Sequence, residues 1–569
     1  MADDLTLVIR GGLVVDGTGA APFEADVGIA GARIVSVGRI PGRGAEEIDA
    51  RGKIVTPGFV DPHTHYDAQV MWANHITPSS CNGVTTALMG NCGVGFAPCK
   101  PEQRDMLVEL MEGVEDIPEP VLTKGLPWNW QSFPDYLDRI AERRFDVDIA
   151  AQVPHAALRV FVMGARGVAR EPATEADRAA MARLAAEGIR AGALGFSTSR
   201  TLNHKTVAGE PTPTLNAAEE ELMAIAKAVG ETGAGWLQVI SDFDDEIESE
   251  FAMFRRLVAA SGRPMTTTIL ERDSKPQEWR RLLDMIGSAN ADGLPITGMV
   301  LTRPTGIMLG FEISQNPFFD CPSWAEIANL PFPAKLAVLR DPSFRARILS
   351  EVPRDPTLKR RLRNWDRMFP LGDPPDYEPS PEQSIGAEAR RAGVDAATFA
   401  YDLMMQNDGR TILYRPLSNY ANGTLETVRE MMAHPNTLIG LGDGGAHVSI
   451  LCDATAMTYG LTHWTRDRKV GRFPLEWMVR RLTSDNARAL GLNDRGVIAA
   501  GRKADINVID HDRLTLRAPE VIYDLPAGGR RLMQKSEGYI ATILSGEIVS
   551  REGELTGKLP GRLQRGPQA

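Results

Sequence analysis

Two histidines one residue apart, His63 and His65, are the strongest chemical signal in the chain. They end the segment 56–65, Thr-Pro-Gly-Phe-Val-Asp-Pro-His-Thr-His, directly after an apolar run. Along a strand, residues i and i+2 point to the same side, so the two imidazoles should project together from the end of this run. Side-by-side imidazoles suit a transition metal such as zinc. We therefore predict that His63 and His65 bind a metal ion; two surface histidines at a turn are the alternative.

A carboxylate in a glycine-rich segment is the second signal. Residues 440–447 read Gly-Leu-Gly-Asp-Gly-Gly-Ala-His and follow a short apolar run. Glycines let a ligand approach the backbone closely. Asp443 could ligate a metal, take a proton from an activated water, or do both, whereas an ordinary turn aspartate is the alternative. His447 could orient a substrate or cap a helix.

A thiol stands at the end of another apolar run. Cys92 belongs to the segment 90–95, Gly-Asn-Cys-Gly-Val-Gly. A thiolate is a good zinc ligand, although a lone cysteine is more often a small buried apolar residue. Both interpretations stay open at this point.

Several imidazoles and cations also follow apolar runs and could bind substrate. An arginine is well suited to a carboxylate because its guanidinium binds in a bidentate manner. A solvated surface cation or a structural histidine is the alternative for each. The candidate substrate-binding residues are His155, Arg200, His204, Arg303 and His447.

Eight apolar runs, alternating with helical patterns, must position these residues. Such alternation predicts βα units and a parallel sheet, and runs that are apolar throughout suit strands buried on both faces. We therefore predict an α/β fold with a (β/α)8 TIM barrel, whose functional groups gather at the carboxyl ends of the strands. The candidate strands are 54–60, 84–89, 147–153, 193–197, 236–240, 264–269, 295–300 and 437–441.

Both ends of the chain look different from its centre. Short β-branched runs separated by glycine turns fill residues 1–56 and 491–569, which predicts a small composite β-sandwich domain formed from both termini; two unrelated β-units are the alternative. Residues 57–490 form the predicted barrel domain. The stretch at about 303–436 is a proline-interrupted insertion, typical of a lid or a subunit contact.

Composition limits the classes of partner and the compartment. The chain has 569 residues and a net charge of -11, which argues against nucleic-acid or anionic-membrane binding because phosphate contacts need clustered cations. Five cysteines at low density argue against a disulfide framework. The start, Met-Ala-Asp-Asp, does not resemble a signal peptide, and no long apolar span occurs. We expect a cytoplasmic protein; a homo-oligomer is open.

Taken together, these segments resemble the amidohydrolase superfamily, in particular its D-aminoacylase (N-acyl-D-amino-acid deacylase) branch. The resemblance implies a TIM barrel with a β-sandwich built from both termini, zinc, and hydrolysis of an N-acyl amide. It also implies that His63 and His65 are metal-site histidines, that Cys92 is a thiolate ligand, and that Asp443 acts as base and then acid. The matching segments are 58–65, 83–93, 153–164, 191–198, 303–306, 439–443 and 496–505.

The chain departs from that branch at two strand ends. D-aminoacylases carry metal-binding histidines after the fifth and sixth strands, but residues 236–242 and 266–271 contain none. The cofactor is therefore one or two Zn²⁺ ions, or another divalent metal. The predicted function is a metal-dependent amide hydrolase that deacylates an N-acyl amino acid, for which the resemblance implies the D configuration. A hydrolase of a cyclic amide or another carboxamide, and a non-catalytic metal-binding barrel, are the alternatives.

Overall fold

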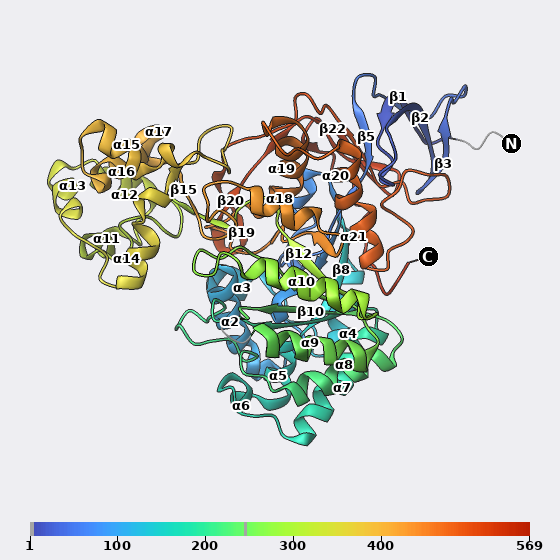
Figure 1. Ribbon diagram of the computed structural model, residues 1–569, viewed down its shortest axis with the longest axis horizontal. Coiled ribbons are helices and arrows are strands. Elements are labelled where there is room, and N and C mark those ends of the chain that lie inside the picture. The colour runs from blue at the N-terminus through green and yellow to red at the C-terminus, as the bar shows by residue number, and fades with distance from the viewer. Residues whose placement is uncertain (1–4, 244–246, 569) are drawn as a thin grey trace.

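The computed structural model describes residues 5–243 and 247–568, and its central feature is an eight-stranded parallel sheet. The strands follow one another in chain order, and helices cover the outside of the sheet (Figure 1). This arrangement confirms the predicted (β/α)8 barrel. Its strands are β6 (Phe59–Asp61), β7 (Val84–Met89), β8 (Asp148–Pro154), β9 (Gly195–Arg200), β10 (Trp236–Ser241), β11 (Met265–Thr268), β12 (Ile296–Val300) and β16 (Thr437–Ile439).

Helices follow most of these strands, as the alternating pattern predicts. They bury an apolar face against the sheet and expose a polar face to solvent, as expected of surface helices. Helix α7, for example, buries Met181, Ala185 and Ile189. The main covering helices are α2 (Arg104–Glu115), α4 (Phe133–Ala141), α5 (His155–Met163), α7 (Glu175–Arg190), α8 (Glu219–Glu231), α9 (Ile247–Ser261), α10 (Glu278–Ala291), α18 (Glu426–Ala433), α20 (Leu475–Leu482) and α21 (Ser484–Ala489).

The first and last barrel strands meet just beyond their carboxyl ends. The amide of Asp443 donates to the carbonyl of His63 at 3.1 Å, and the amide of His65 donates to the carbonyl of Gly444 at 2.7 Å. Backbone bonds thus join the two segments that the sequence identifies as metal-binding. Because backbone hydrogen bonds fix relative position closely, the seam that closes the barrel also sets the spacing of the candidate ligands.

A buried asparagine also joins the first and last barrel strands, β6 and β16. The side-chain amide of Asn486, in α21, donates to the carbonyls of Val60 and Ile439, both at 2.8 Å. Asn486 is fully buried. It donates to a backbone carbonyl of each end strand, and buried carbonyls require such donors.

Both termini contribute to a second sheet of nine strands. N-terminal strand β1 pairs with β2, β4 and β5, and β5 pairs with C-terminal β17, which continues into β22, β23 and β24. The composite β-domain is therefore confirmed. The strands are β1 (Leu7–Val14), β2 (Phe23–Ala30), β3 (Arg33–Gly38), β4 (Glu46–Asp49), β5 (Ile54–Pro57), β17 (Ile506–Ile509), β22 (Tyr539–Leu544), β23 (Glu547–Arg551) and β24 (Glu554–Leu555).

One predicted strand is wrong in its extent. The run 54–60 splits at Gly58 into β5, which joins the composite sheet, and β6, which begins the barrel. A Cβ at Gly58 would lie 2.2 Å from the Thr85 hydroxyl, so this close crossing between the two sheets requires glycine. Periodicity cannot reveal the split because both halves are buried and apolar.

The insertion between β12 and β16 forms a separate lobe, drawn in yellow on the left of Figure 1. It has its own core, which includes Phe311, Trp324 and Tyr401, while α18 beyond it packs on β12 and β16. We call the segment 306–416 the insertion lobe. It contains β13 (Gly306–Leu309), α11 (Pro322–Ile327), α12 (Phe332–Leu339), α13 (Pro342–Leu349), α14 (Pro356–Leu362), β14 (Phe369–Pro370), α15 (Ile385–Ala392), α16 (Ala396–Met404), α17 (Gln406–Gly409) and β15 (Leu413–Pro416).

The length and apolarity of the described helices were compared with those of membrane-spanning helices. None of them, within residues 5–243 and 247–568, combines the length and apolarity needed to cross a bilayer. The first four residues, on which the expectation about a leader rests, lie outside the described part of the chain.

Candidate metal centre

Four side chains from three barrel strand ends converge at the mouth of the barrel. His63 Nε2 lies 3.4 Å from Cys92 Sγ and 3.3 Å from Asp443 Oδ1. His65 Nε2 lies 3.7 Å from the same Asp443 oxygen. The ligand atoms of His63, His65 and Cys92 all lie within 4.8 Å of one another. The structure therefore brings together all four residues predicted to bind metal.

Some polar atoms of this cluster lack the hydrogen bonds that their burial requires. Asp443 Oδ1 is buried and has no hydrogen-bond partner among the described residues, and the same is true of His63 Nδ1. Buried polar groups without partners are costly. Two imidazoles and a thiol are donors that suit zinc, and a carboxylate at the same point can bind the ion or take a proton from a water bound to it. The residues present thus fit a divalent metal.

Burial keeps both histidines neutral. It lowers the pKa of His63 to about 3, helped by the nearby His204 and His447 imidazoles, and lowers that of His65 well below its ordinary value. A neutral imidazole has a free lone pair for a metal. The two ring centroids are 5.4 Å apart, as expected for side chains that project together from one segment.

The backbone around the cluster departs from ordinary geometry. Cys92, Leu441, Asp443 and His447 all have positive φ, at 55°, 62°, 42° and 49°. Such a conformation costs a non-glycine residue about 1–3 kcal/mol and persists where the surroundings enforce it, often at functional sites. Gly442 is also constrained, because a Cβ there would meet a carboxylate oxygen of Asp61 at 2.1 Å.

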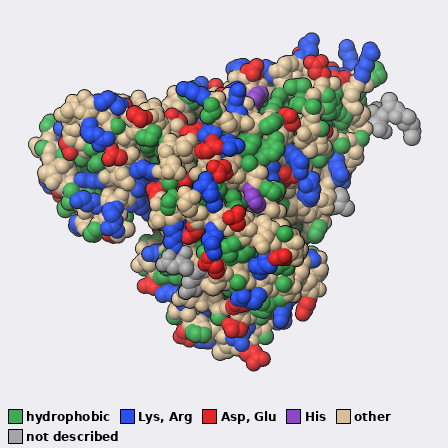
Figure 2. All heavy atoms as spheres, viewed as in Figure 1, with side chains coloured by type: hydrophobic (Ala, Val, Ile, Leu, Met, Phe, Trp, Pro, Cys, Tyr) green, Lys and Arg blue, Asp and Glu red, His purple; other side chains and the backbone are tan. Residues whose placement is uncertain are grey.

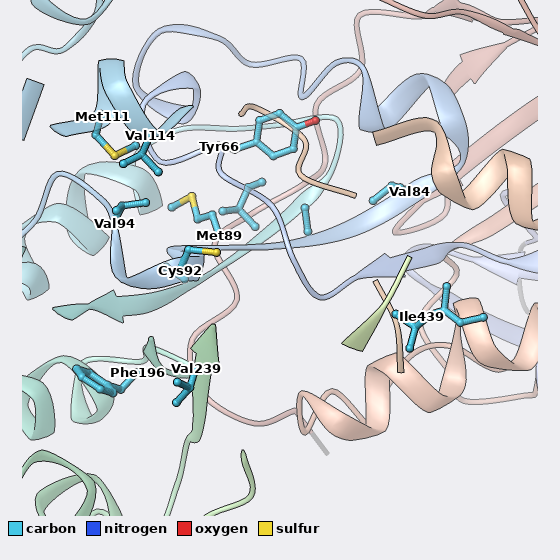
Figure 3. Close-up of a cluster of buried hydrophobic side chains, with 14 of the residues drawn as sticks. Tyr66, Val84, Met89, Cys92, Val94, Met111, Val114, Phe196, Val239 and Ile439 are labelled. Atoms are coloured by element: carbon cyan, nitrogen blue, oxygen red, sulfur yellow. The ribbon is translucent and has the colours of Figure 1, made fainter. Parts of the chain in front are cut away.

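Cys92 enters the cluster from an apolar pocket. Its sulfur lies among side chains that include Met89, Met111 and Val114 (Figure 3), and its amide donates to Gln238 Oε1 at 2.9 Å. Burial raises the pKa of the Cys92 thiol well above its usual range, and the Asp443 carboxyl adds to the effect. A nearby cation would favour the thiolate, so the pocket suits a metal ligand better than a surface nucleophile.

Glu115 is a member of the site that the sequence did not reveal. It ends α2 and is 1% exposed. Its Oε1 lies 3.1 Å from His65 Nδ1 and its Oε2 lies 3.9 Å from His447 Nε2. Burial raises the pKa of Glu115 well above its usual value, and the Asp443 and Asp67 carboxyls raise it further. No motif surrounds Glu115, so only the packing of α2 over the mouth brings it here.

His204 and His447 lie beside the cluster, as the depressed pKa of His63 shows. Burial lowers the pKa of each to about 4. The Nδ1 atom of His204 lies 3.0 Å from the Ser199 hydroxyl. Both imidazoles are neutral near pH 7 and can exchange hydrogen bonds with a polar molecule at the mouth.

His155 belongs to a network of protein side chains. Its Nδ1 pairs with Thr198 Oγ1 at 2.8 Å and its Nε2 with Glu221 Oε1 at 2.7 Å. Arg159 binds the same Glu221 carboxylate. Because both ring nitrogens already have partners, His155 supports the barrel wall, and we assign it no role in binding substrate.

The two predicted carboxylate-binding arginines already hold protein carboxylates. Arg303 is fully buried and pairs with Asp453 at 2.9 Å, and Arg200 pairs with Glu250 at 2.5 Å. A guanidinium engaged in this way would have to give up a short ion pair to bind substrate. The sequence could not foresee these pairings because the partners are far away along the chain.

The fifth and sixth strand ends offer no imidazole, as the sequence shows. Gln238 on β10 is used to hold the Cys92 amide. On β11, the hydroxyls of Thr266, Thr267 and Thr268 are buried and have no hydrogen-bond partner among the described residues. Hydroxyl and amide groups are weaker ligands for zinc than histidine, so this half of the mouth is poorly equipped for a second ion.

Comparison with known proteins places the chain in a family. A sequence model of the amidohydrolase family matches residues 46–550. N-acyl-D-aspartate deacylase and D-aminoacylase of Alcaligenes xylosoxydans xylosoxydans are 28% and 25% identical to this chain, each over 98% of it and over 94% and 97% of their own lengths. The structure of N-acyl-D-glutamate deacylase from Bordetella bronchiseptica, in complex with zinc and a phosphonate inhibitor, aligns over 99% of this chain and 100% of that one, with a TM-score of 0.65 and 22% identity.

The chain therefore belongs to the amidohydrolase family. It is a metal-dependent hydrolase of amide carbon–nitrogen bonds, as the sequence predicts. The likeness to the Bordetella bronchiseptica structure supports the fold: a barrel with an additional β-domain.

Proposed function

We propose that the protein removes the acyl group from an N-acyl amino acid, with one Zn²⁺ ion held by His63, His65, Cys92 and Asp443. The convergence of these four side chains within a few ångströms is the observation that carries the proposal. The lack of imidazoles at the fifth and sixth strand ends favours one ion over two.

The residues around the cluster can perform the proton transfers of hydrolysis. A divalent metal in this position supplies Lewis acidity, which activates water and stabilises negative charge on the carbonyl oxygen. Asp443 is placed to accept a proton from the attacking water and to return it to the leaving amine. Burial, together with the Asp453 and Asp61 carboxyls, raises the pKa of Asp443; a bound cation would favour the carboxylate, the form that accepts the proton.

The proposed substrate class rests on the relatives. N-acyl-D-aspartate deacylase, D-aminoacylase and N-acyl-D-glutamate deacylase are all similar to this chain over more than nine-tenths of it. Each of those names describes deacylation of an N-acyl-D-amino acid, so we propose the D configuration here. A hydrolase of cyclic amides or other carboxamides is the second candidate, because the fifth and sixth strand ends lack the histidines of D-aminoacylases and so line the mouth with different side chains.

Two broader expectations also remain proposals. All five cysteines are free thiols, which supports a reducing, cytoplasmic compartment. The second proposal is a homo-oligomer. The insertion lobe, which protrudes from the barrel in Figure 1, is the candidate subunit contact.

The test is a substrate panel measured with metal-loaded and metal-free protein. Purified protein loaded with zinc would be incubated with N-acetyl derivatives of D- and L-amino acids and with hydantoins, and free amine would be quantified. We expect chelator-sensitive release of amine from N-acetyl-D-amino acids. Release only from the cyclic amides would select the second candidate instead.

A further inference from the structure

Two arginines of the insertion lobe have guanidiniums that form no ion pair with any described residue. Arg415, on β15, is 9% exposed, and Arg361, on α14, is partly buried. Neither guanidinium forms a hydrogen bond with a residue in the described ranges, and the Nε atom of each is buried without a partner. Removing a guanidinium from water without a counter-charge is costly.

Neighbouring arginines in the same lobe are satisfied, which makes these two exceptional. Arg367 pairs with Asp273 at 2.9 Å, and Arg363 donates to the carbonyls of Pro317 and Glu351. No described carboxylate forms an ion pair with Arg361 or Arg415; Asp273, which raises the pKa of Arg415, is paired with Arg367 instead. An anion that the chain itself does not contain would relieve the deficit.

The chain leads directly from Arg415 to the rim of the barrel. Just after β15, the amide of Leu417 donates to the Thr305 carbonyl at 2.8 Å, and the amide of Asn419 donates to the Glu271 carbonyl at 2.8 Å. Glu271 lies three residues beyond β11, the sixth barrel strand. Arg415 is thus fixed close to the carboxyl ends of the strands, where barrel enzymes bind their substrates.

Strand β13 connects Arg415 to the segment that follows Asp443. Ile307 of β13 pairs with Arg415, and the Met308 amide donates to the Ile450 carbonyl at 2.9 Å, three residues after His447. Burial lowers the pKa of Arg415 to about 10; Asp273 opposes that shift, and Arg367 and Arg361 add to it. Burial lowers the pKa of His447 to about 4, and His204 and then Arg361 add to that shift. His447 in turn lies 3.9 Å from Glu115. Figure 1 shows the insertion lobe beside the barrel on the side of α2, whose last residue is Glu115, and Figure 2 shows Lys and Arg side chains along the lower edge of that lobe.

We propose that Arg361 and Arg415 together bind the carboxylate of the substrate while its amide bond lies at the metal centre. The inference rests on the proposed function, because it takes an N-acyl amino acid as the substrate. Two guanidiniums offer several donors in fixed planes and bind a carboxylate in a bidentate manner. The arginines predicted from the sequence, Arg200 and Arg303, are committed to Glu250 and Asp453 and leave this role open.

The subsite should select for the free acid. Binding that depends on a carboxylate discriminates strongly against analogues in which that charge is removed, because the paired cations are then left without a partner. We expect the protein to hydrolyse an N-acyl amino acid much faster than the corresponding N-acyl amino-acid amide at equal concentration.

The experiment compares two substitutions on two substrates. Arg415→Gln and Arg361→Gln would be assayed, as zinc-loaded full-length proteins, on the best N-acetyl amino acid of the panel and on its carboxamide. We expect kcat/KM for the acid to fall by about 10–100-fold, the range of a lost hydrogen bond to a charged group, mainly through KM. The value for the carboxamide should change by less than about threefold, because that compound never uses the charge.

Matched variants separate this effect from misfolding. Arg360→Gln removes an exposed arginine of the same helix and should leave both substrates unaffected. Arg415→Lys keeps the charge and should retain a larger share of the activity on the acid than Arg415→Gln does. Arg361→Gln provides an independent test if Arg415→Gln does not fold, because Arg361 is less buried.

The outcomes distinguish the two proposals. Failure of the wild-type protein to hydrolyse any N-acyl amino acid would overturn the proposed function. Hydrolysis by the wild type, with both Gln variants unchanged or with acid and carboxamide affected equally, would overturn the carboxylate subsite alone.

Discussion

His65 and Glu115 face each other across 3.1 Å at the mouth of the barrel. Nδ1 of His65 lies on the side of the Glu115 carboxyl and forms no hydrogen bond with a described residue, while Nε2 lies 3.7 Å from Asp443 Oδ1. A carboxylate on one side of an imidazole favours the proton on that nitrogen and leaves the other free for a metal. Glu115 therefore acts as a positioning residue for a predicted metal ligand.

Replacing Glu115 by Gln should weaken metal binding by about 10–100-fold, the usual effect of losing such a carboxylate partner. The measurement is zinc affinity by competition with a chromophoric chelator, together with the visible spectrum of the cobalt-substituted protein. Glu109→Gln, on the exposed side of the same helix, is the control. Unaltered affinity and an unaltered cobalt spectrum in Glu115→Gln would show that Glu115 does not position His65.

Asp443→Asn should keep the metal but lower kcat by about 10²–10⁴-fold, because the amide can no longer accept a proton. Turnover on the best substrate and metal content by elemental analysis would be measured on the same samples. Asp408→Asn, in an exposed ion pair of the insertion lobe, should have no effect. Near-normal turnover in Asp443→Asn would remove Asp443 from the proton transfers.

Asn486→Ala should destabilise the barrel by about 2–5 kcal/mol. The substitution leaves the buried carbonyls of Val60 and Ile439 without their donor, and each unsatisfied group costs about 1–3 kcal/mol. Chemical denaturation followed by far-UV circular dichroism would measure the change in unfolding free energy. Asn493→Ala, at an exposed position, should change the unfolding free energy by less than about 0.5 kcal/mol. Equal effects from the two substitutions would mean that the hydrogen bonds of Asn486 do not stabilise the barrel.

Much of the barrel and of its mouth is predictable from the sequence, for a local reason. Parallel strands buried on both faces appear as continuous apolar runs, so all eight barrel strands could be located. His63 and His65 share one side of an extended segment because the side-chain period of a strand is two. Asp443 and Cys92 could be placed at strand ends by their glycine neighbours.

What could not be predicted depends on contacts between distant segments. Glu115 ends a helix whose placement over the mouth leaves no local pattern. Arg200 and Arg303 look available in the sequence, but their carboxylate partners become apparent only in the fold. Arg361 and Arg415 stand out for the opposite reason, because the fold withdraws them from solvent wholly or in part and forms no ion pair with either among the described residues.

Acid should destabilise the contact between Glu378 and its cations. Burial raises the pKa of Glu378, but hydrogen bonds from His463 and Arg468 outweigh burial and hold that pKa well below its usual value. A group whose pKa is lowered on folding stabilises the protein above its unfolded pKa, near 4.5 here, and that contribution is lost as the pH falls. Unfolding free energy should therefore decline below about pH 5.

Glu378→Gln isolates that contribution. The variant should be about 2 kcal/mol less stable than the wild type at pH 7, the scale of hydrogen bonds to a charged group, and the difference should shrink as the pH is lowered toward 3. Denaturation curves at several pH values would measure it. A difference that stays constant with pH would mean that the carboxylate charge is not responsible.

Elemental analysis of the purified protein tests the central claim, that His63, His65, Cys92 and Asp443 hold one metal ion. The account predicts about one zinc or other divalent ion per wild-type chain, and its loss in His63→Ala and in Cys92→Ala, with no loss in His434→Ala. A full complement of tightly bound metal in His63→Ala and Cys92→Ala would contradict it.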